Sequence, residues 1–311
     1  MFDTVCFRLY KEVAGDVDLL TKIPCCLNNV GEHYYNNEPI ITGDLNGLKI
    51  SLNTNQLKVK DGSLCKWFLG DNFKTMGRSD TQKAIEKLSD ILHLPMDKAT
   101  VTRLDVAQNF ITMHQPEVYF NHLGELRYTA RLLQPSGLYY KGSNLSLCFY
   151  DKNKERKSHR RPIPDLYQNR NVLRYEQRYT SRVASQMGVS EVTGALLYDE
   201  AFYQDVLNRW RAKYEAIQKV NDISINLEAM KTKQQLYKMG VLSIAQMAGG
   251  AMKMYEQIRE AQNQGKLTKK QAFDLRKTFK DALEVREGLT VQDEAIKELN
   301  KKVAEAIKYY R

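Results

Sequence analysis

This sequence has no long apolar run and no recognisable secretion signal. No stretch approaches the roughly 20 consecutive apolar residues that a membrane-spanning helix needs. The first ten residues, Met1 to Tyr10, lack the basic region and apolar block of a signal peptide. We therefore expect a cytoplasmic protein with no membrane partner.

Several kinds of catalytic or metal site are also missing. The five cysteines, Cys6, Cys25, Cys26, Cys65 and Cys148, form no CxxC pair, so we expect reduced packing residues and neither disulfides nor zinc. The five histidines include no His-x-His pair, which excludes a metal site built on such a pair. Walker, GxSxG and HExxH motifs are absent.

Acidic residues are outnumbered, and the excess of positive charge is concentrated in one place. The chain has 47 Lys and Arg against 37 Asp and Glu, a net charge of +10. Residues 141–182 contain 11 Lys or Arg and 4 Asp or Glu, which is 11 − 4 = +7 of that excess. Such a segment is typical of a protein that neutralises a nucleic-acid backbone. The alternative is a basic, solvated loop.

The length and the pattern of the chain predict two domains. With 311 residues, 42% of them hydrophobic, it can bury a sizeable core. Up to about residue 182, short alternating runs are separated by turn signals such as Asn46-Gly47, Asp61-Gly62 and Ser136-Gly137. After residue 190 long helical patterns follow. We predict an α+β protein, with an antiparallel-sheet domain over residues 1–188 and an α-helical domain over residues 189–311.

Several helix boundaries are readable. Ser79 or Asp80 is a candidate cap for a helix that Pro95 closes, and Thr268 and Thr290 are candidate starts for two later helices. The segment 234–260 contains short helical patterns broken at Gly240 and at Gly249-Gly250, which would suit a helix-turn-helix. Helical hairpins without any DNA contact have the same pattern. The helical domain is therefore a candidate for either DNA binding or oligomerisation.

Three strand-like segments carry reactive groups on one face only, because successive side chains in a strand point to opposite sides. In 145–150 the apolar face is Leu145, Leu147 and Phe149, which turns Tyr150 away from the core. The polar faces of the two other segments, 101–110 and 172–179, hold Arg103, Asp105, Asn109, Arg174, Glu176 and Arg178.

If these faces meet in one sheet, the residues suit the transfer of a phosphodiester to tyrosine. A free phenol attacks poorly at neutral pH, so Tyr150 needs cations nearby. Asp105 and Glu176 have the hard oxygen ligands that Mg²⁺ or Mn²⁺ prefers, and Lys152 or Arg174 would steady the phosphate oxygens. The candidate contacts to other DNA phosphates are Arg103, Lys141, Lys154, Arg156, Arg174 and Arg178. The alternative is an ordinary solvated sheet face, with Asp105 paired to Arg103 and Tyr150 a packing group.

Four blocks, taken in order, resemble a known family. They are 57–60 with 62–66 and 69–72, then Thr102-Arg103-Leu104-Asp105-Val106-Ala107, then Phe149-Tyr150-Asp151-Lys152-Asn153-Lys154-Glu155-Arg156, and last Leu173-Arg174-Tyr175-Glu176-Gln177-Arg178. Together they resemble the rolling-circle replication initiators of filamentous phages, the gene II/X replication protein family, and more distantly the single-tyrosine plasmid initiators. The order and spacing of the blocks, spanning about residues 40–190, carry the resemblance.

The resemblance implies that Tyr150 is the nicking tyrosine, that Asp105 and Glu176 bind the metal, and that Lys152 and Glu155 belong to the active-site motif. The plasmid relatives tend to have a second acid four residues after the one matched by Asp105. Here that position is Asn109, whose amide oxygen is the remaining possible ligand.

We therefore expect a metal-dependent DNA nicking-closing endonuclease that initiates rolling-circle replication. In this hypothesis Tyr150 forms a 5′-phosphotyrosyl link and frees a 3′-OH. The expected partners are origin DNA, duplex and single-stranded, and a host helicase and polymerase. A homodimer or an activated water would complete termination.

Three alternatives belong to other classes. A non-catalytic DNA- or RNA-binding protein would stack bases on tyrosines such as Tyr139, Tyr140, Tyr175 and Tyr179. A tyrosine recombinase would place its nucleophile late in a helical catalytic domain, and Tyr309-Tyr310 lacks that setting. A structural protein with a solvated basic sheet is the third.

Overall fold

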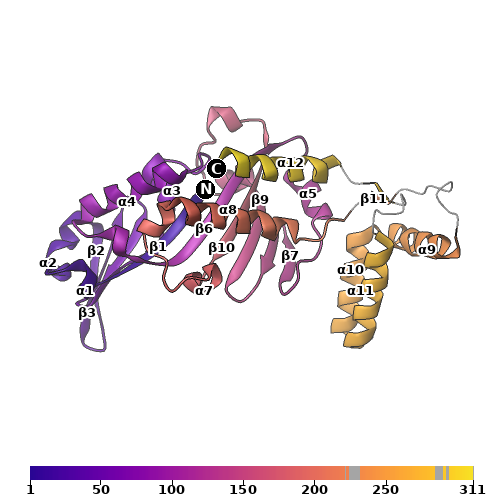
Figure 1. Cartoon of the computed structure of the whole chain (residues 1–311), viewed down its shortest axis with the longest axis horizontal. Helices are drawn as coiled ribbons and strands as arrows, with labels where there is room; N and C mark the ends of the chain where they lie inside the picture. Colours follow the sequence, from indigo (N-terminus) through magenta and orange to yellow (C-terminus); the bar gives the residue numbers. More distant parts are fainter. Residues whose placement is uncertain (221, 224–231, 284–289, 292–293, 311) are drawn as a thin grey trace.

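A computed structural model of the chain describes residues 1–220, 222–223, 232–283, 290–291 and 294–310. Its centre is a ten-stranded antiparallel sheet in the order β2-β3-β4-β5-β1-β6-β10-β9-β8-β7 (Figure 1). The strands are β1 (Phe2–Tyr10), β2 (Asn28–Tyr35), β3 (Glu38–Leu45), β4 (Leu48–Leu52), β5 (Gln56–Asp61), β6 (Thr100–Thr112), β7 (Ala130–Gln134), β8 (Gly137–Lys141), β9 (Leu145–Asp151) and β10 (Asn171–Tyr179). The predicted α+β class and antiparallel sheet are confirmed.

Turn residues set the strand ends where the sequence predicts them. Asn46 and Gly47 join β3 to β4 with φ angles of 51° and 99°, the left-handed pair that a two-residue hairpin turn requires. Pro135 and Ser136 join β7 to β8, and Gly137, the first residue of β8, has a positive φ angle of 154°. The alternation of side chains then assigns one face of the sheet to the core.

Helices flank the sheet and form the rest of the chain. Their bounds are α1 (Lys11–Ala14), α2 (Leu19–Lys22), α3 (Leu64–Leu69), α4 (Arg78–Leu92), α5 (Pro116–His122), α6 (Lys152–Ser158), α7 (Val183–Met187), α8 (Glu200–Glu215), α9 (Lys233–Met247), α10 (Ala251–Asn263), α11 (Lys269–Leu283) and α12 (Glu294–Tyr309). Short 3₁₀ turns lie at Pro24–Cys26, Met96–Lys98, Asp165–Tyr167 and Ala195–Tyr198. Within the described residues, none of these helices combines the length and the apolar character that crossing a membrane demands.

Helix α8 closes the apolar face of the sheet over the central strands. Tyr175 of β10 lies between Phe149 and Trp210, with ring centroids 4.5 Å and 4.7 Å away. Its hydroxyl donates to the Trp210 carbonyl at 3.1 Å. Offset aromatic stacking adds to the free energy of apolar burial. The apolar face of β9 and β10 is therefore packed against α8.

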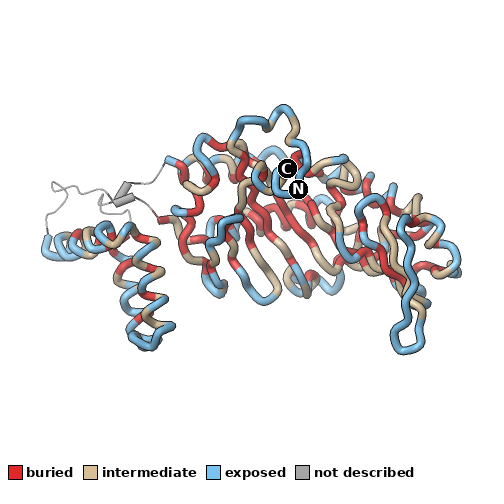
Figure 2. Tube along the Cα trace, turned by 180° about the vertical axis from the view of Figure 1, so that it is seen from behind, coloured by how far each residue is buried: buried red, intermediate tan, exposed pale blue. Residues whose placement is uncertain are grey.

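Helices leave most of the opposite face of the central strands open, as Figure 2 shows from behind, and α6 packs against the ends of β9 and β10. Because side chains alternate, the residues between the core positions of β6, β9 and β10 point to this face. It holds every residue that the sequence assigned to the polar face of these strands.

Helices α9, α10 and α11, residues 233–283, form a separate bundle that we call the module. It has a small core of its own, including Met239, Leu242, Tyr255 and Phe279. In contrast, α8 and α12 share the core of the sheet. We call the sheet with α1 to α8 and α12 the body. The predicted boundary at residue 188 thus lies before α8, a helix of the body core.

A two-stranded ribbon joins the two units. Strand β11 (Asp222–Ile223) pairs with β12 (Thr290–Val291), the segments on either side of the module. The chain leaves the body after α8, forms the module and returns as α12 (Figure 1).

Some predicted helix boundaries are wrong. Helix α4 begins at Arg78, with Gly77 as the N-cap, and Asp80 instead accepts the Gly77 N–H at 3.0 Å from inside the first turn. Thr290 lies in β12, and the following helix starts at Glu294. Thr268 does cap α11, accepting the Gln271 N–H at 3.2 Å.

The predicted helix break at Gly240 is also wrong, since α9 continues through this residue without interruption. Helical hydrogen bonds along a packed face tolerate a single glycine at a cost of about 1 kcal/mol. The break at Gly249-Gly250 is confirmed, because both residues have positive φ angles and separate α9 from α10.

Candidate active site

The register of the central strands brings the predicted reactive groups together. Arg174 of β10 lies opposite Tyr150 of β9 on one side and Asn109 of β6 on the other. Two residues further along β10, Glu176 lies opposite Cys148. Opposed residues in an antiparallel pair share a face. The tyrosine, an arginine and a carboxylate therefore meet on the uncovered face.

Tyr150 lines a cavity of about 450 Å³. Glu155 of α6, Tyr139 of β8 and Arg178 of β10 are among the other lining residues. Burial raises the pKa of Tyr150 well above its usual value, the charge of Glu176 adds to the rise, and Arg174 opposes it. The phenol is therefore protonated at neutral pH, and any attack by it requires a proton acceptor.

Arg174 is almost completely enclosed, with 2% of its surface exposed. Its Nη1 donates to the Asn72 carbonyl and to Asn109 Oδ1, each at 3.1 Å, and its Nη2 pairs with Asp3. Glu176 Oε1 lies 3.7 Å from the same Nη2. The Nε is buried and has no hydrogen-bond partner among the described residues. The Nε–H of Arg174 is thus a hydrogen-bond donor, held in a fixed position beside Tyr150, that has no partner among the described residues.

Asp3 is a site residue that sequence analysis missed. It is buried at the start of β1, and besides Arg174 it accepts a hydrogen bond from Ser63. Asn72 Nδ2 approaches both of its oxygens at 3.3 Å. The signal available in the sequence was an acid inside the apolar run Phe2–Phe7. Ser63 and Asn72 both lie in the first block of the family resemblance, which explains their place beside the site.

Helix α6 places Glu155 in the lining of the cavity and Lys152, which is fully buried, beside the Tyr150 ring. Asp151 ends β9 and caps this helix by accepting the N–H groups of Asn153 and Lys154 at 2.9 Å and 3.0 Å. Lys152 Nζ is 2.7 Å from Glu155 Oε2 and 6.0 Å from the centre of the Tyr150 ring. Burial, assisted by the charge of Arg174, lowers the pKa of Lys152 to about 8. Burial alone would raise the pKa of Glu155, but Lys152 outweighs it and lowers the pKa.

The two predicted metal ligands lie on neighbouring strands, and each is matched by an arginine. Arg103 donates to both oxygens of Asp105 at 3.0 Å and 2.7 Å, and Arg178 donates to Glu176 at 2.6 Å. Burial raises the pKa of Asp105 to about 6, Arg103 opposes the rise, and Glu176 adds to it. The acids are therefore close enough to repel each other.

These contacts decide how well a divalent cation fits. Among the described residues, no group of three or more His, Cys, Asp or Glu side chains is arranged to hold a metal ion. Asn109 uses its amide to hold Arg174 and the carbonyls of residues 72 and 73. The hard carboxylate oxygens of Asp105 and Glu176 do suit such a cation. In this structure the guanidinium groups of Arg103 and Arg178 occupy the place beside these carboxylates that a cation would take. Their side chains are 31% and 32% exposed, so both could move out into solvent.

The remaining predicted phosphate contacts differ in how exposed they are and in whether they already have a partner within the protein. Lys141 is exposed and lines a hollow next to Arg178. Lys154 is exposed but pairs with Glu117. Arg156 is largely enclosed. It donates to the Pro162 carbonyl at 2.9 Å and lies 3.6 Å from Asp71, so its contacts are within the protein.

A family model for the N-terminal region of the phage gene II replication-associated protein matches residues 1–198. The match covers the whole sheet, including every residue of the site. The chain belongs to the gene II replication protein family. The predicted resemblance is thereby confirmed. Membership supports a role as a phage DNA replication initiator and, with it, binding to origin DNA.

A search of curated proteins finds no match to this gene II family chain. The matched range ends before α8, so the module and α12 lie outside it. The family therefore informs the sheet and its site, and the module has to be described from its own residues.

The tyrosines invoked for base stacking mostly lie elsewhere. Tyr140, Tyr175 and Tyr179 are buried on the core side, and the Tyr140 hydroxyl donates to the Gly124 carbonyl at 2.7 Å. Of the four, Tyr139 alone lines the Tyr150 cavity. Stacking by the other three is therefore wrong for this gene II family protein.

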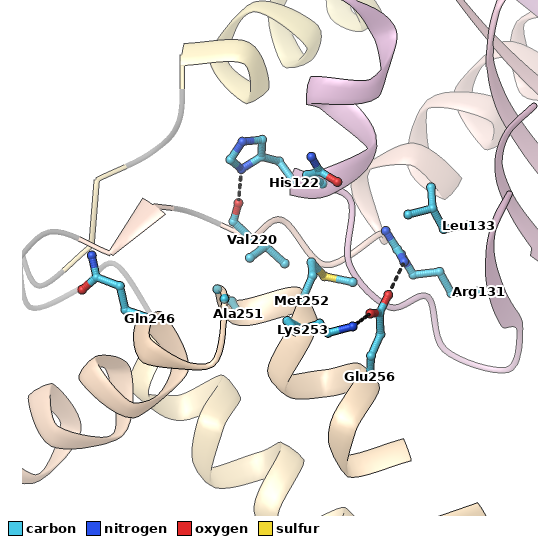
Figure 3. Close-up of a pocket in the computed structure, with 12 residues that line it drawn as sticks. His122, Arg131, Leu133, Val220, Gln246, Ala251, Met252, Lys253 and Glu256 are labelled. Carbon is cyan, nitrogen blue, oxygen red and sulfur yellow. Dashed lines mark hydrogen bonds and ion pairs between the residues drawn. The ribbon is translucent and has the colours of Figure 1, made fainter. Parts of the chain in front are cut away.

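A second cavity, of about 600 Å³, lies between the body and the module (Figure 3). Arg131 of the body faces Glu256 of α10 across it at 3.9 Å, and Arg259 donates to the Arg131 carbonyl at 3.1 Å. Gln218 donates to Tyr255 at 2.8 Å nearby. A few polar contacts thus join the two units.

Proposed function

We propose that this protein nicks one strand of the phage replication origin through Tyr150 and later rejoins it. The observation that carries the proposal is the position of the Tyr150 phenol, in the wall of an accessible cavity and directly across the strand pair from the fixed charge of Arg174. A buried phenol opposite a permanent cation is suited to forming a phenolate at the moment of reaction.

In the proposed step, the Tyr150 oxygen attacks the scissile phosphorus and the bond from phosphorus to the 3′ oxygen breaks. The products are a 5′-phosphotyrosyl link and a free 3′-OH. One phosphodiester replaces another, so the reverse reaction closes the strand without ATP. Arg174, through its unpartnered Nε, stabilises negative charge on the phenolate and on the phosphoryl oxygens.

Lys152 is the proposed proton carrier. Because its pKa is lowered to about 8, a fraction of Lys152 is neutral near physiological pH and able to take the phenol proton. The resulting ammonium returns that proton to the 3′ oxygen as it leaves, so protons balance. The rate of cleavage should then rise with pH through about pH 8, and Lys152→Met should remove this rise. A pH–rate profile of single-turnover cleavage measures it.

We also propose that Asp105 and Glu176 bind Mg²⁺ or Mn²⁺ when Arg103 and Arg178 withdraw. The cation would supply Lewis-acid polarisation of the phosphate. Calorimetric titration with Mn²⁺ tests this without any activity measurement. Binding should be lost in Asp105→Asn and in Glu176→Gln, and kept in Asp205→Asn on α8. Equal binding by all four proteins would contradict the assignment.

Further partners follow from the proposed products. A free 3′-OH is the substrate of a host polymerase, and displacing the old strand requires a host helicase. With one nucleophilic tyrosine per site, a second subunit of a homodimer or an activated water would complete termination.

The decisive experiment uses single-stranded origin oligonucleotide and divalent metal, followed by mass spectrometry of the protein. We expect a DNA adduct on Tyr150 in the unmodified protein and none in Tyr150→Phe, which should still bind DNA. Tyr139→Phe, in the same cavity, is the matched control and should keep the adduct on Tyr150. Cleavage by Tyr150→Phe, or an adduct on another residue, would overturn the proposal in favour of a different nucleophile or a binding-only protein.

A further inference from the structure

Three cations lie side by side on the uncovered face, away from Tyr150. Arg8 of β1 is the register partner of Lys58 on β5, and Lys60 follows two residues later on the same strand and face. All three, with Arg103 of β6, line a hollow of about 290 Å³. In the described parts of the chain, none of the three has a carboxylate within salt-bridge distance. We call Arg8, Lys58 and Lys60 the basic triad.

The basic triad opposes the stability of the fold that carries it. Like charges directly opposite each other destabilise a strand pair. Burial, followed by the charges of Arg8 and Lys60, lowers the pKa of Lys58. The Arg8 Nε is enclosed without a hydrogen-bond partner in the described structure. An anion placed in the hollow would relieve the repulsion and satisfy this donor.

An exposed aromatic ring completes the surface. Tyr10, 42% exposed at the end of β1, accepts a hydrogen bond from Arg8 Nη1 at 3.2 Å. A positively charged groove with an adjoining aromatic side chain is the common architecture of sites for single-stranded nucleic acid, where phosphates meet cations and a base stacks on the ring.

The hollow is connected to the candidate active site by shared residues. Thr180 belongs both to it and to a neighbouring hollow of about 460 Å³ that contains Lys141. That second hollow shares Tyr139 and Arg178 with the Tyr150 cavity. The path crosses the sheet in the order β9, β10, β6, β1, β5. With strands about 4.8 Å apart, it extends roughly 20 Å from Tyr150.

We propose that the basic triad binds backbone phosphates of the single-stranded DNA that continues from the nick, several nucleotides beyond Tyr150, with Tyr10 stacking on a base there. The inference rests on the proposed nicking function for the identity of the strand. It adds a second contact point, which holds the strand across the sheet while its end is reacting at Tyr150.

The test is the salt dependence of binding to fluorescent oligothymidines from about 4 to about 16 nucleotides long. All proteins carry Tyr150→Phe, so cleavage does not interfere. Lys58→Gln with Lys60→Gln should weaken binding of the long oligonucleotide about tenfold at low salt. It should also lower the slope of log affinity against log salt by about 1.4, since each single-strand phosphate contact contributes about 0.7. The shortest oligonucleotide, held at the Tyr150 cavity, should show a smaller change.

Two matched variants distinguish the effect of positive charge at the basic triad from the effect of the total charge of the protein. Lys58→Arg with Lys60→Arg keeps the cations and should keep the slope. Lys297→Gln with Lys301→Gln removes two exposed cations from α12, which packs against α5 and α8, and should also keep it. An unchanged slope in the Lys58/Lys60 glutamine protein, or an equal loss in the α12 control, would overturn the proposal.

The outcomes for the two proposals are distinguishable. If Tyr150→Phe itself cleaves origin DNA, the nicking proposal fails whatever the slopes are. If Tyr150→Phe is inactive but the triad slopes do not change, only the second contact point fails. Competition by inorganic phosphate or by an acidic peptide as strong as that by oligothymidine would assign the triad to a different anion, and so would also overturn it.

Discussion

The body and the module differ in where they keep their charges. In the body, four charged residues are buried and each is paired with another side chain. Arg174, Asp105 and Glu176 are paired on the strands, and Lys152 is paired within α6. The module carries ten Lys or Arg and four Asp or Glu over residues 232–283, so 10 − 4 = +6, mostly at its surface around a small core. Buried charges have fixed positions, and surface charges attract without fixing geometry. The body therefore holds its charges in fixed positions, whereas the module carries its excess of positive charge at the surface.

The strongest test of this comparison is to remove the central buried charge of the body. Arg174→Met leaves Asp3 and Glu176 without their common partner, and should lower the free energy of unfolding by about 4 kcal/mol. Urea unfolding followed by tryptophan fluorescence measures it, because Trp210 lies in the body core. Arg211→Met, an exposed pair with Glu215, is the control and should cost less than about 1 kcal/mol. A loss below that level for Arg174→Met would mean that its pairs do not stabilise the body.

A core substitution in the module should have a slightly smaller effect, confined to the module. Phe279 is buried there, with its ring 5.0 Å from that of Tyr255, and Phe279→Ala should cost about 3 kcal/mol. Since the cores of the two units are separate, hydrogen exchange should accelerate in α9 to α11 and stay unchanged in β6, β9 and β10. Phe273→Ala, on an exposed residue of the same helix, is the matched control. Faster exchange in the central strands would show that the units unfold together.

Substitution of Asp105 should, in contrast, increase the stability of the protein. The folded-state pKa of Asp105 is raised from its ordinary 3.8 to about 6, so between these pH values the folded protein binds more protons than the unfolded chain, and stability falls as pH rises. Asp105→Asn removes this loss and should raise the free energy of unfolding at pH 7 by about 3 kcal/mol. Urea titrations at pH 4 and pH 7 measure the change. The same pH dependence in both proteins would exclude Asp105 as its source.

The smallest effect is expected at the joint shown in Figure 3. Arg131 and Glu256 are 3.9 Å apart and Glu256 is partly solvated, so Glu256→Gln should change stability by at most about 0.5 kcal/mol. The rotational correlation time of the module, measured by NMR relaxation, should fall slightly as it gains freedom from the body. A large loss of stability would instead indicate that the units act as one.

The sheet and much of its site could be predicted because their signals are local. The alternation in 101–110, 145–150 and 172–179 is enough to place Asp105, Tyr150 and Glu176 on the polar face, and turn residues separate the strands. The family resemblance then supplied the order of the blocks.

Asp3 could not be found in this way, because β1 loses register with β6 between Phe2 and Val5. An irregularity of this kind shifts the phase of the alternation, and only the pairing of the strands reveals it. The basic triad was missed for a similar reason. Arg8 and Lys58 are about 50 residues apart in the sequence and meet only through the β1–β5 register.

The packing of the C-terminal half also depends on contacts between residues that are far apart in the sequence, so it could not be predicted from local patterns. Helical periodicity indicated α8 and α12 as helices but gave no sign that they pack in one core across the intervening module. Tyr214 of α8 donates to Asn300 of α12 at 2.7 Å, a contact between residues 86 positions apart. Glu298 similarly accepts the Met113 N–H at 3.1 Å.

The return of the chain through α12 makes the module an insertion within the body. A protease cut inside α9, α10 or α11 would divide the polypeptide but not the folded body, because the C-terminal fragment still contributes Ile296, Leu299, Val303 and Ile307 to its core. The two fragments should therefore elute together from a sizing column and separate only in denaturant. The same geometry allows the module to be exchanged for another folded unit without moving either end of the body.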